Sequence, residues 1–206
     1  VDIEIKRLEK DLFGLNLDSI HNAIPYLHDK YGKFYELYNN NVINIGGSNL
    51  RTYPDNLRSF LTDYDMNKVY NKIMKTYPDM EDIRKKLELG FKHYRYYFPE
   101  KEIPGIYTFM GGFNQSIVIA DSILAIGLDK YLGRDCEYYD KLGWDQYRQK
   151  NMHKKKIPTD CLHAWARTEW PFDDSTDNLL SNMLYRGKLI YFTKSMLPGE
   201  ADTLIM

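Results

Sequence analysis

The sequence has no excess of basic residues. It carries 28 lysine and arginine residues against 29 aspartate and glutamate residues, which gives a formal net charge of −1. Proteins that bind nucleic acids usually carry a basic excess, because their contacts to phosphate groups depend on lysine and arginine. The charge balance therefore argues against nucleic acid as a partner, and it does not favour binding to an anionic membrane surface.

Long apolar runs are also missing. A helix that spans a membrane needs roughly 20 consecutive apolar residues. The longest apolar stretches, Ile117–Ala120 and Ile123–Leu128, have the length of strands. The chain starts at Val1 with no visible signal peptide or lipobox, which leaves the targeting route open.

Cysteine is rare. The two cysteines, Cys136 and Cys161, cannot make a disulfide framework in a chain of this length. We expect two unpaired thiols; a single disulfide between them is the alternative, since the sequence does not show whether they are close. The cysteine count therefore does not fix the redox compartment.

Metal-binding motifs are absent. The five histidines are spread along the chain, and neither H-E-x-x-H nor C-x-x-C occurs. His21 and His28 lie seven residues apart on roughly one predicted helix face, but no acid completes a cluster of ligands. The sequence therefore predicts no metal site.

Motifs for a nucleophile or for phosphate binding are missing as well. G-x-S-x-G does not occur, and Gly46-Gly47 and Gly111-Gly112 are not followed by Gly-Lys-Ser/Thr. Cys161 and His163 are close in sequence, but a catalytic pair is defined by its distance in space. We therefore predict no catalytic residue and no cofactor, and a non-enzyme is expected over an enzyme.

The first part of the chain, about residues 1–98, is predicted to be mainly helical, after a strand-like alternation over 1–6. The clearest helix covers about 79–98. Its apolar residues recur every three or four positions, which places them on one face. We predict that Leu87 and Phe91, in the middle of this face, are buried.

The pattern changes at about residue 104. Ile106–Met110, Ile117–Ala120 and Ile123–Leu128 are β-branched and aromatic runs with polar or glycine breaks, which is typical of short strands. The connections are tight, and tight connections favour antiparallel neighbours. We therefore predict a small antiparallel sheet over about 104–132.

Helical periodicity returns over about 142–197. Together, the three parts predict a single domain over 1–206. Its fold class is α+β, mostly helical with a small central sheet.

Several segments, in order over nearly the whole chain, share a recognisable pattern. The most specific is Gly127-Leu128-Asp129-Lys130-Tyr131-Leu132-Gly133. The others are Val1–Ile5, Phe91–Pro99, Ile103–Asn114 and Met183–Phe192. Together they resemble the gliding-motility lipoprotein GldB family of Bacteroidota.

The resemblance implies a cell-envelope lipoprotein, anchored in the membrane through a lipidated cysteine upstream of Val1 and facing the periplasm or the cell surface. It also implies an association with gliding motility or its linked protein secretion machinery. The resemblance implies no enzymatic activity and no cofactor for this chain. We therefore expect a non-catalytic protein that binds an envelope protein or a ligand, and that meets the membrane only through its anchor.

The candidate binding surface is the sheet and the loops beside it: Tyr107, Phe109, Phe113, Asn114, Asp129 and Tyr131. Asp129 and Tyr131 are two positions apart, so on an extended chain both side chains would project to the same side. They would form a polar pair, with the carboxylate accepting from a phenol or from backbone N–H groups. The alternative is that Asp129 closes a turn and supports the fold.

A second, weaker similarity is to zincin-type metallopeptidases, in which a small sheet precedes two helices. Here the first of these helices, near 159–169, contains Asp160-Cys161-Leu162-His163-Ala164-Trp165-Ala166-Arg167, which keeps one histidine and lacks the glutamate base. A zincin-like scaffold would therefore be degenerate. The alternative function is a hydrolase, peptidase-like, whose site uses Asp121, Asp129 or His163.

Overall fold

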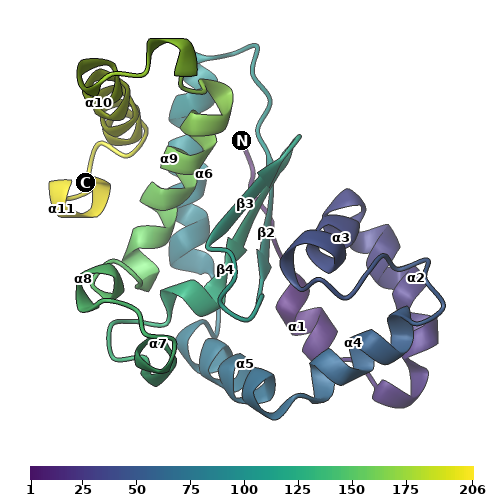
Figure 1. Cartoon of the computed structure of the whole chain (residues 1–206). Helices are drawn as coiled ribbons and strands as arrows, with labels where there is room; N and C mark the ends of the chain where they lie inside the picture. Colours follow the sequence, from purple (N-terminus) through teal and green to yellow (C-terminus); the bar gives the residue numbers. More distant parts are fainter.

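The computed structural model describes residues 1–206, apart from the side chain of Thr176, and a four-stranded sheet lies at its centre (Figure 1). The strands are β1 (Ile5–Arg7), β2 (Gly105–Phe109), β3 (Ile117–Ala120) and β4 (Ile123–Gly127), in the spatial order β1-β2-β4-β3. β1 is parallel to β2 and β2 is parallel to β4, whereas β3 is antiparallel to β4. The sheet is therefore mixed.

Helices α1 to α4 cover one face of the sheet (Figure 1). They are α1 (Leu8–Phe13), α2 (Ile20–Tyr31), α3 (Lys33–Leu37) and α4 (Tyr53–Thr62), with a 3₁₀ turn at Leu17–Ser19 and a π turn at Tyr38–Val42. Their buried side chains form one apolar cluster with Phe109, Ile123 and Ala125 of the sheet.

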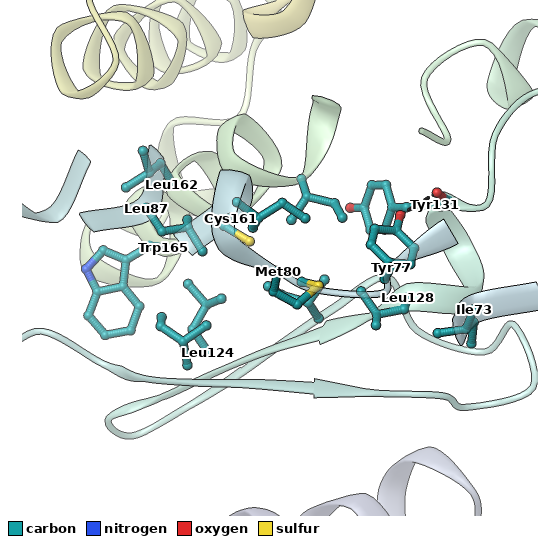
Figure 2. Close-up of a cluster of buried hydrophobic side chains, with 14 of the residues drawn as sticks. Ile73, Tyr77, Met80, Leu87, Leu124, Leu128, Tyr131, Cys161, Leu162 and Trp165 are labelled. Carbon is teal, nitrogen blue, oxygen red and sulfur yellow. Dashed lines mark hydrogen bonds between the residues drawn. The ribbon is translucent and has the colours of Figure 1, made fainter. Parts of the chain in front are cut away.

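Helices α5, α6 and α9 cover the opposite face. They are α5 (Tyr64–Thr76), α6 (Glu81–Tyr97) and α9 (Ile157–Glu169). Short elements lie between β4 and α9: a 3₁₀ turn at Leu128–Tyr131, α7 (Glu137–Lys141), α8 (Gln146–Gln149) and a 3₁₀ turn at Lys154–Lys156. Figure 2 shows part of the second apolar cluster, which contains Leu87 of α6, Leu124 of β4 and Trp165 of α9.

Side chains of the two central strands alternate between these clusters. Ile106 and Leu124 belong to the cluster with α6 and α9, whereas Tyr107 and Ala125 pack on the side of α1 to α4. Because helices cover both faces, every position of β4 is apolar. This explains why Ile123–Leu128 is a continuous apolar run and not an alternating one.

The α+β fold with a small sheet and a predominance of helix is confirmed, but the predicted antiparallel arrangement is wrong for two of the strand pairs. Tight connections constrain only strands that are neighbours in both sequence and space. This holds for β3 and β4, which the short turn at Asp121-Ser122 joins. β2 pairs instead with β1, which precedes helices α1 to α6, and with β4, which follows β3, so both pairs can be parallel.

α10 (Leu179–Met196) and α11 (Asp202–Ile205) lie outside α9, and a 3₁₀ turn at Asp174–Thr176 precedes them (Figure 1). α10 packs on α9 and α6, and its buried residues are Leu189, Thr193 and Met196. None of the helices in the described part of the chain combines the length and the hydropathy that a membrane span requires.

α6 is the helix that the sequence predicted over about 79–98. It begins at Glu81, and the carboxylate of Asp79 accepts a hydrogen bond from the Glu81 N–H at 3.0 Å. Leu87 and Phe91 are fully buried, which confirms the predicted core face.

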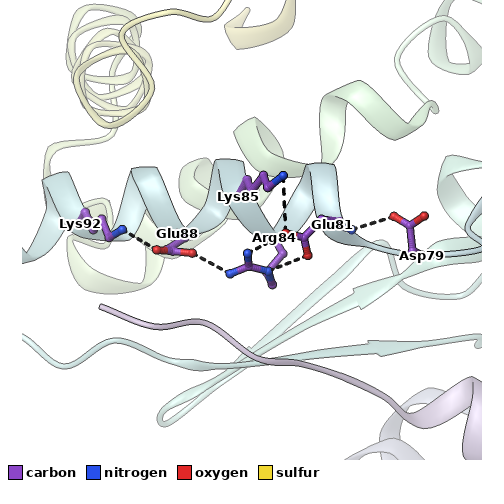
Figure 3. Close-up of polar contacts among 6 residues, drawn as sticks. All are labelled: Asp79, Glu81, Arg84, Lys85, Glu88 and Lys92. Carbon is purple, nitrogen blue, oxygen red and sulfur yellow. Dashed lines mark hydrogen bonds and ion pairs between the residues drawn. The ribbon is translucent and has the colours of Figure 1, made fainter.

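Ion pairs line the solvent side of α6 (Figure 3). Arg84 lies 2.7 Å from carboxylate oxygens of both Glu81 and Glu88, and Lys92 also pairs with Glu88. Pairs of this kind on the surface of a protein add little to stability. The buried face of α6 is therefore what holds the helix in place.

Leu87→Ala should lower the free energy of unfolding by about 3 kcal/mol, because it removes buried methyl groups and leaves a cavity. Leu89 is the control, since it lies on the same helix with its side chain 46% exposed. Leu89→Ala should cost less than about 0.5 kcal/mol. Urea melts of the two variants and the parent chain measure both values, and equal losses would show that the Leu87 face is not a core face.

Candidate functional site

Tyr107 and Phe109, two of the predicted binding residues, pack between the sheet and α3. Their ring centroids lie 4.7 Å and 6.2 Å from that of Phe34. Phe109 is fully buried, and Tyr107 is half-buried. Their contacts are with the protein core, and a role in ligand binding stays a prediction.

Asp129 holds the loop between β2 and β3. Its Oδ2 atom accepts hydrogen bonds from the backbone N–H groups of Gly111, at 3.1 Å, and Phe113, at 2.6 Å. Gly112 and Phe113 have φ angles of 64° and 67°, in the left-handed region that a residue with a side chain disfavours. The carboxylate therefore stabilises a backbone conformation that would otherwise be strained. This geometry fits the supporting role of Asp129, and a role in recognition stays a prediction.

Asn114 connects the same loop to the π turn at Tyr38–Val42, on the side of the sheet that α1 to α4 cover. Its side-chain Nδ2 donates to the carbonyl oxygen of Val42 at 3.0 Å. Gly111 contacts the same residue, since a Cβ atom there would lie 2.6 Å from a methyl carbon of Val42. Phe113 is buried, and Asn114 is the exposed member of the predicted set.

The predicted pairing of Asp129 with Tyr131 is wrong. Leu128–Tyr131 forms a 3₁₀ turn and not an extended chain, so the two side chains do not share one side. The Tyr131 hydroxyl donates to Asp160 of α9 at 3.0 Å, and its carbonyl oxygen accepts from the Tyr77 hydroxyl at 2.5 Å. Of the two kinds of donor considered for Asp129, backbone N–H groups are the ones observed.

Burial raises the pKa of Asp129 to about 6, although the N–H groups of Phe113 and Gly111 act in the opposite direction. The side chain is fully buried, and its Oδ1 atom has no hydrogen-bond partner among the described residues. The carboxylate therefore lacks one of the hydrogen bonds that its charged form needs. Protonation of the carboxylate relieves part of the free-energy cost of burying that charge.

Asp129 should contribute more stability as the pH falls from 7 to about 5. The pKa of Asp129 is about 6 in the folded chain, against an ordinary value of 3.8, so within this window the folded chain binds a proton that the unfolded chain does not. The resulting gain should be about 1–3 kcal/mol. Burial also raises the pKa of Asp160 to about 6, which acts in the same direction, whereas burial lowers the pKa of His153 and His163, which acts in the opposite direction. Melting temperatures by circular dichroism at the two pH values measure the effect.

Asp129→Asn is the control for this pH dependence, because the amide stays neutral throughout the range. On going from pH 7 to pH 5, the change in its melting temperature should be less favourable than the change in the parent chain. Equal changes in the variant and the parent chain would contradict the prediction.

The residues of the alternative hydrolase site are not brought together. Asp121 and Asp129 lie at opposite ends of β4, and Asp121 forms an ion pair with Lys33 at 3.2 Å. His163 lines a groove between α9 and α10. Across the described residues, no group of three or more His, Cys, Asp or Glu side chains is placed to hold a metal ion.

Both cysteines are free and buried, which confirms the expectation of unpaired thiols. Burial raises the pKa of the Cys161 thiol well above its ordinary value, and the neighbouring Asp160 adds to this effect. A thiol that stays protonated is a poor nucleophile. The geometry around Cys161 is therefore that of a core residue.

α10 exposes a line of large apolar side chains. Leu180, Leu184 and Tyr191 are 66%, 58% and 76% exposed. At about 100° per residue, these three and Gly187 lie on one side of the helix, opposite the buried Leu189. We call these four residues the outer face of α10. Leu179 and Met183, which are also exposed, flank it.

The packing of the chain does not explain this outer face. A surface helix normally turns polar residues to solvent, whereas α10 is apolar on both sides and contains no acidic residue. Gly187 has no atom within 4 Å of the position that a Cβ would take. Glycine inside a helix lowers the free energy of unfolding by about 1 kcal/mol relative to alanine. Alanine at position 187 would therefore make the isolated chain more stable.

The sequence predicts helical structure over about 142–197 but not this surface. The available signal was the absence of a polar face from Leu179–Met196. A helix that is apolar on all sides is equally typical of a buried helix. Only the structure shows that α10 lies at the periphery.

Comparison with protein-family models matches residues 1–206, the whole chain, to the family described as "Gliding motility protein GldB". No curated protein and no solved structure matches the chain. The match confirms the family resemblance that the sequence segments carry. The likeness to zincins is left without support.

Proposed function

Because the chain belongs to the gliding motility protein GldB family, a family of gliding-motility-associated lipoproteins, we propose that it acts without catalysis, by binding an envelope protein through the outer face of α10. The observation that carries the proposal is the apolar line of Leu180, Leu184 and Tyr191, which the fold leaves uncovered. Exposed apolar surface of this kind is typical of protein–protein contacts. The chain would thus link its partner to the membrane that holds its lipid anchor.

The shape of the outer face suits a helix of the partner. From Leu180 to Tyr191 the face spans twelve residues, or about 16 Å at about 1.5 Å of rise between residues, and it is one helix wide. Gly187, between Leu184 and Tyr191, leaves space for a close approach of the partner backbone. Amphipathic helices bind such surfaces through apolar side chains spaced three and four residues apart.

The charge of α10 indicates which residues should flank the apolar side of the partner helix. α10 carries Arg186, Lys188 and Lys194 and no acid. Lys194 pairs with Asp202 at 2.6 Å, whereas Lys188 is exposed and forms no ion pair within the described chain. Charge complementarity therefore favours a partner helix with acidic residues beside its apolar residues.

Gly187→Ala should separate folding from binding. The variant should gain about 0.5–1 kcal/mol in the free energy of unfolding, because alanine favours the helix and its methyl group meets no atom of the chain. It should bind the partner several-fold more weakly, because the methyl group occupies space at the centre of the outer face. Denaturant melts and recovery of the partner from envelope extract measure the two effects.

Gly199→Ala is the control, since a Cβ at Gly199 would also meet no atom within 4 Å, and the residue lies outside the outer face. It should leave recovery of the partner unchanged. Undiminished recovery by Gly187→Ala would show that no partner approaches the helix at this point.

A further inference from the structure

A second feature of α10 is a groove on another side of the helix, between α9, α10 and α11. Its volume is about 510 Å³, which lies within the range of pockets that hold small ligands. α9 contributes His163 and Arg167, and α10 contributes Arg186 and Ile190. Ile205 of α11 and the following Met206 also line the groove.

The two arginines in this groove are not used by the fold. Neither Arg167 nor Arg186 takes part in an ion pair or a hydrogen bond within the described chain, and both are exposed. Asp174 is the only acidic side chain among the described residues that line the groove. The side chains of the groove therefore include two guanidinium groups and one carboxylate.

His163 adds a hydrogen-bonding group without adding charge. Burial lowers its pKa, and the nearby Arg167 and Lys156 lower it further. Asn182 and Tyr185 of α10 also line the groove, so polar and apolar side chains are mixed along its walls.

We propose that this groove binds the C-terminal carboxylate of a peptide whose last residue is apolar. The planar guanidinium groups of Arg167 and Arg186 suit a carboxylate, which each can bind through two parallel hydrogen bonds. Ile190 and Ile205 receive the last side chain. The side-chain oxygen of Asn182 accepts from a peptide N–H, since its Nδ2 atom already donates to Asp177 and to the Asn178 carbonyl oxygen. A fatty acid fits the groove less well, because an acyl chain would cover the His163 ring, which has no hydrogen-bond partner within the described chain.

Isothermal titration of the whole chain with tetrapeptides that have free C termini tests the proposal. Peptides that end in Leu, Ile, Val or Phe should bind with dissociation constants below about 1 mM, a free energy of about −4 kcal/mol. The same peptides with an amidated C terminus should bind at least tenfold more weakly. Arg167→Gln and Arg186→Gln should each weaken binding at least tenfold, and Arg134→Gln, which changes an exposed arginine elsewhere, should not.

Three results would overturn the inference. They are the absence of binding by every peptide at 1 mM, equal affinity for the acid and the amide, and tighter binding of laurate than of any peptide. The outcome is independent of the proposed function, because Leu184→Glu changes the outer face of α10 and leaves the groove intact. That variant should bind the tetrapeptides as the parent chain does.

Discussion

Replacing Gly127 with alanine should lower the free energy of unfolding by at least about 4 kcal/mol, a large part of the stability of an ordinary domain. Gly127 is the last residue of β4, and its N–H donates to the carbonyl oxygen of Ser116 at 2.9 Å. A Cβ atom at this position would lie 2.2 Å from the carbonyl oxygen of Gln115. That distance is far inside van der Waals contact, so the backbone of one segment has to move.

Buried side chains next to Gly127 restrict such a movement. The Cβ would also lie 3.2 Å from Asp129 Oδ1 and 3.2 Å from the ring of Phe109, and both of these side chains are fully buried. A shift at Gln115 would strain the loop that Asp129 holds through Gly111 and Phe113. The cost therefore includes lost hydrogen bonds as well as the steric clash.

Chemical denaturation of Gly127→Ala and of Gly133→Ala tests this prediction. Gly133 closes the same seven-residue segment of the sequence but would place its Cβ in open space, at a φ of 98°. Its substitution should cost only about 1–2 kcal/mol, from the left-handed backbone. A loss below about 1 kcal/mol for Gly127→Ala would show that β3 and β4 do not approach as the structure has them.

The sequence predicted those elements whose signal is local. The apolar line of α6 and the apolar runs of β3 and β4 depend on the spacing of nearby residues, and each element lies within a few residues of its predicted range. Burial of Leu87 followed from the same spacing. These predictions needed no information about distant parts of the chain.

The errors concern contacts between distant residues. The pairing of β2 with β1 and β4 depends on where the helices carry the chain, and the strand sequences do not encode it. Tyr131 meets Asp160, 29 residues away, and not Asp129. Within the part predicted to be mainly helical, α2 ends at Tyr31, because Gly32 adopts a φ of 53° that a helix cannot continue. Strand pairing and the partner of Tyr131 depend on tertiary contacts, and the end of α2 depends on a single backbone angle. The local sequence pattern determines none of the three.

Leu184→Glu should weaken binding of the partner at least 100-fold, or about 2.7 kcal/mol. Leu184 lies in the outer face of α10 with 58% of its surface exposed in the free chain. Burying a leucine side chain against a partner contributes about 1.5–3 kcal/mol, and burying a glutamate carboxylate against the apolar side of the partner adds a desolvation penalty. Because the side chain is exposed, the stability of the free chain should change by less than about 0.5 kcal/mol.

Leu50→Glu is the matched control, since Leu50 is 49% exposed and lies in the loop before α4, on the other side of the sheet. It adds the same charge and should leave binding unchanged. If both variants retain the partner, the outer face of α10 is not its binding surface. If both lose it, the added charge acts through the whole molecule and not through a local contact.

Photo-crosslinking in the native envelope tests the central claim most directly. A benzoylphenylalanine residue replaces Tyr191, which is 76% exposed in the outer face of α10, or Tyr64, which is 70% exposed on α5. We expect the probe at position 191 to give one protein adduct. Its crosslinked segment, mapped by mass spectrometry, should be an amphipathic helix with acidic residues. The probe at position 64 should not give this adduct. Adducts of the Tyr191 probe with lipid alone, with a second copy of this chain alone, or with the same proteins that the Tyr64 probe captures would contradict the account.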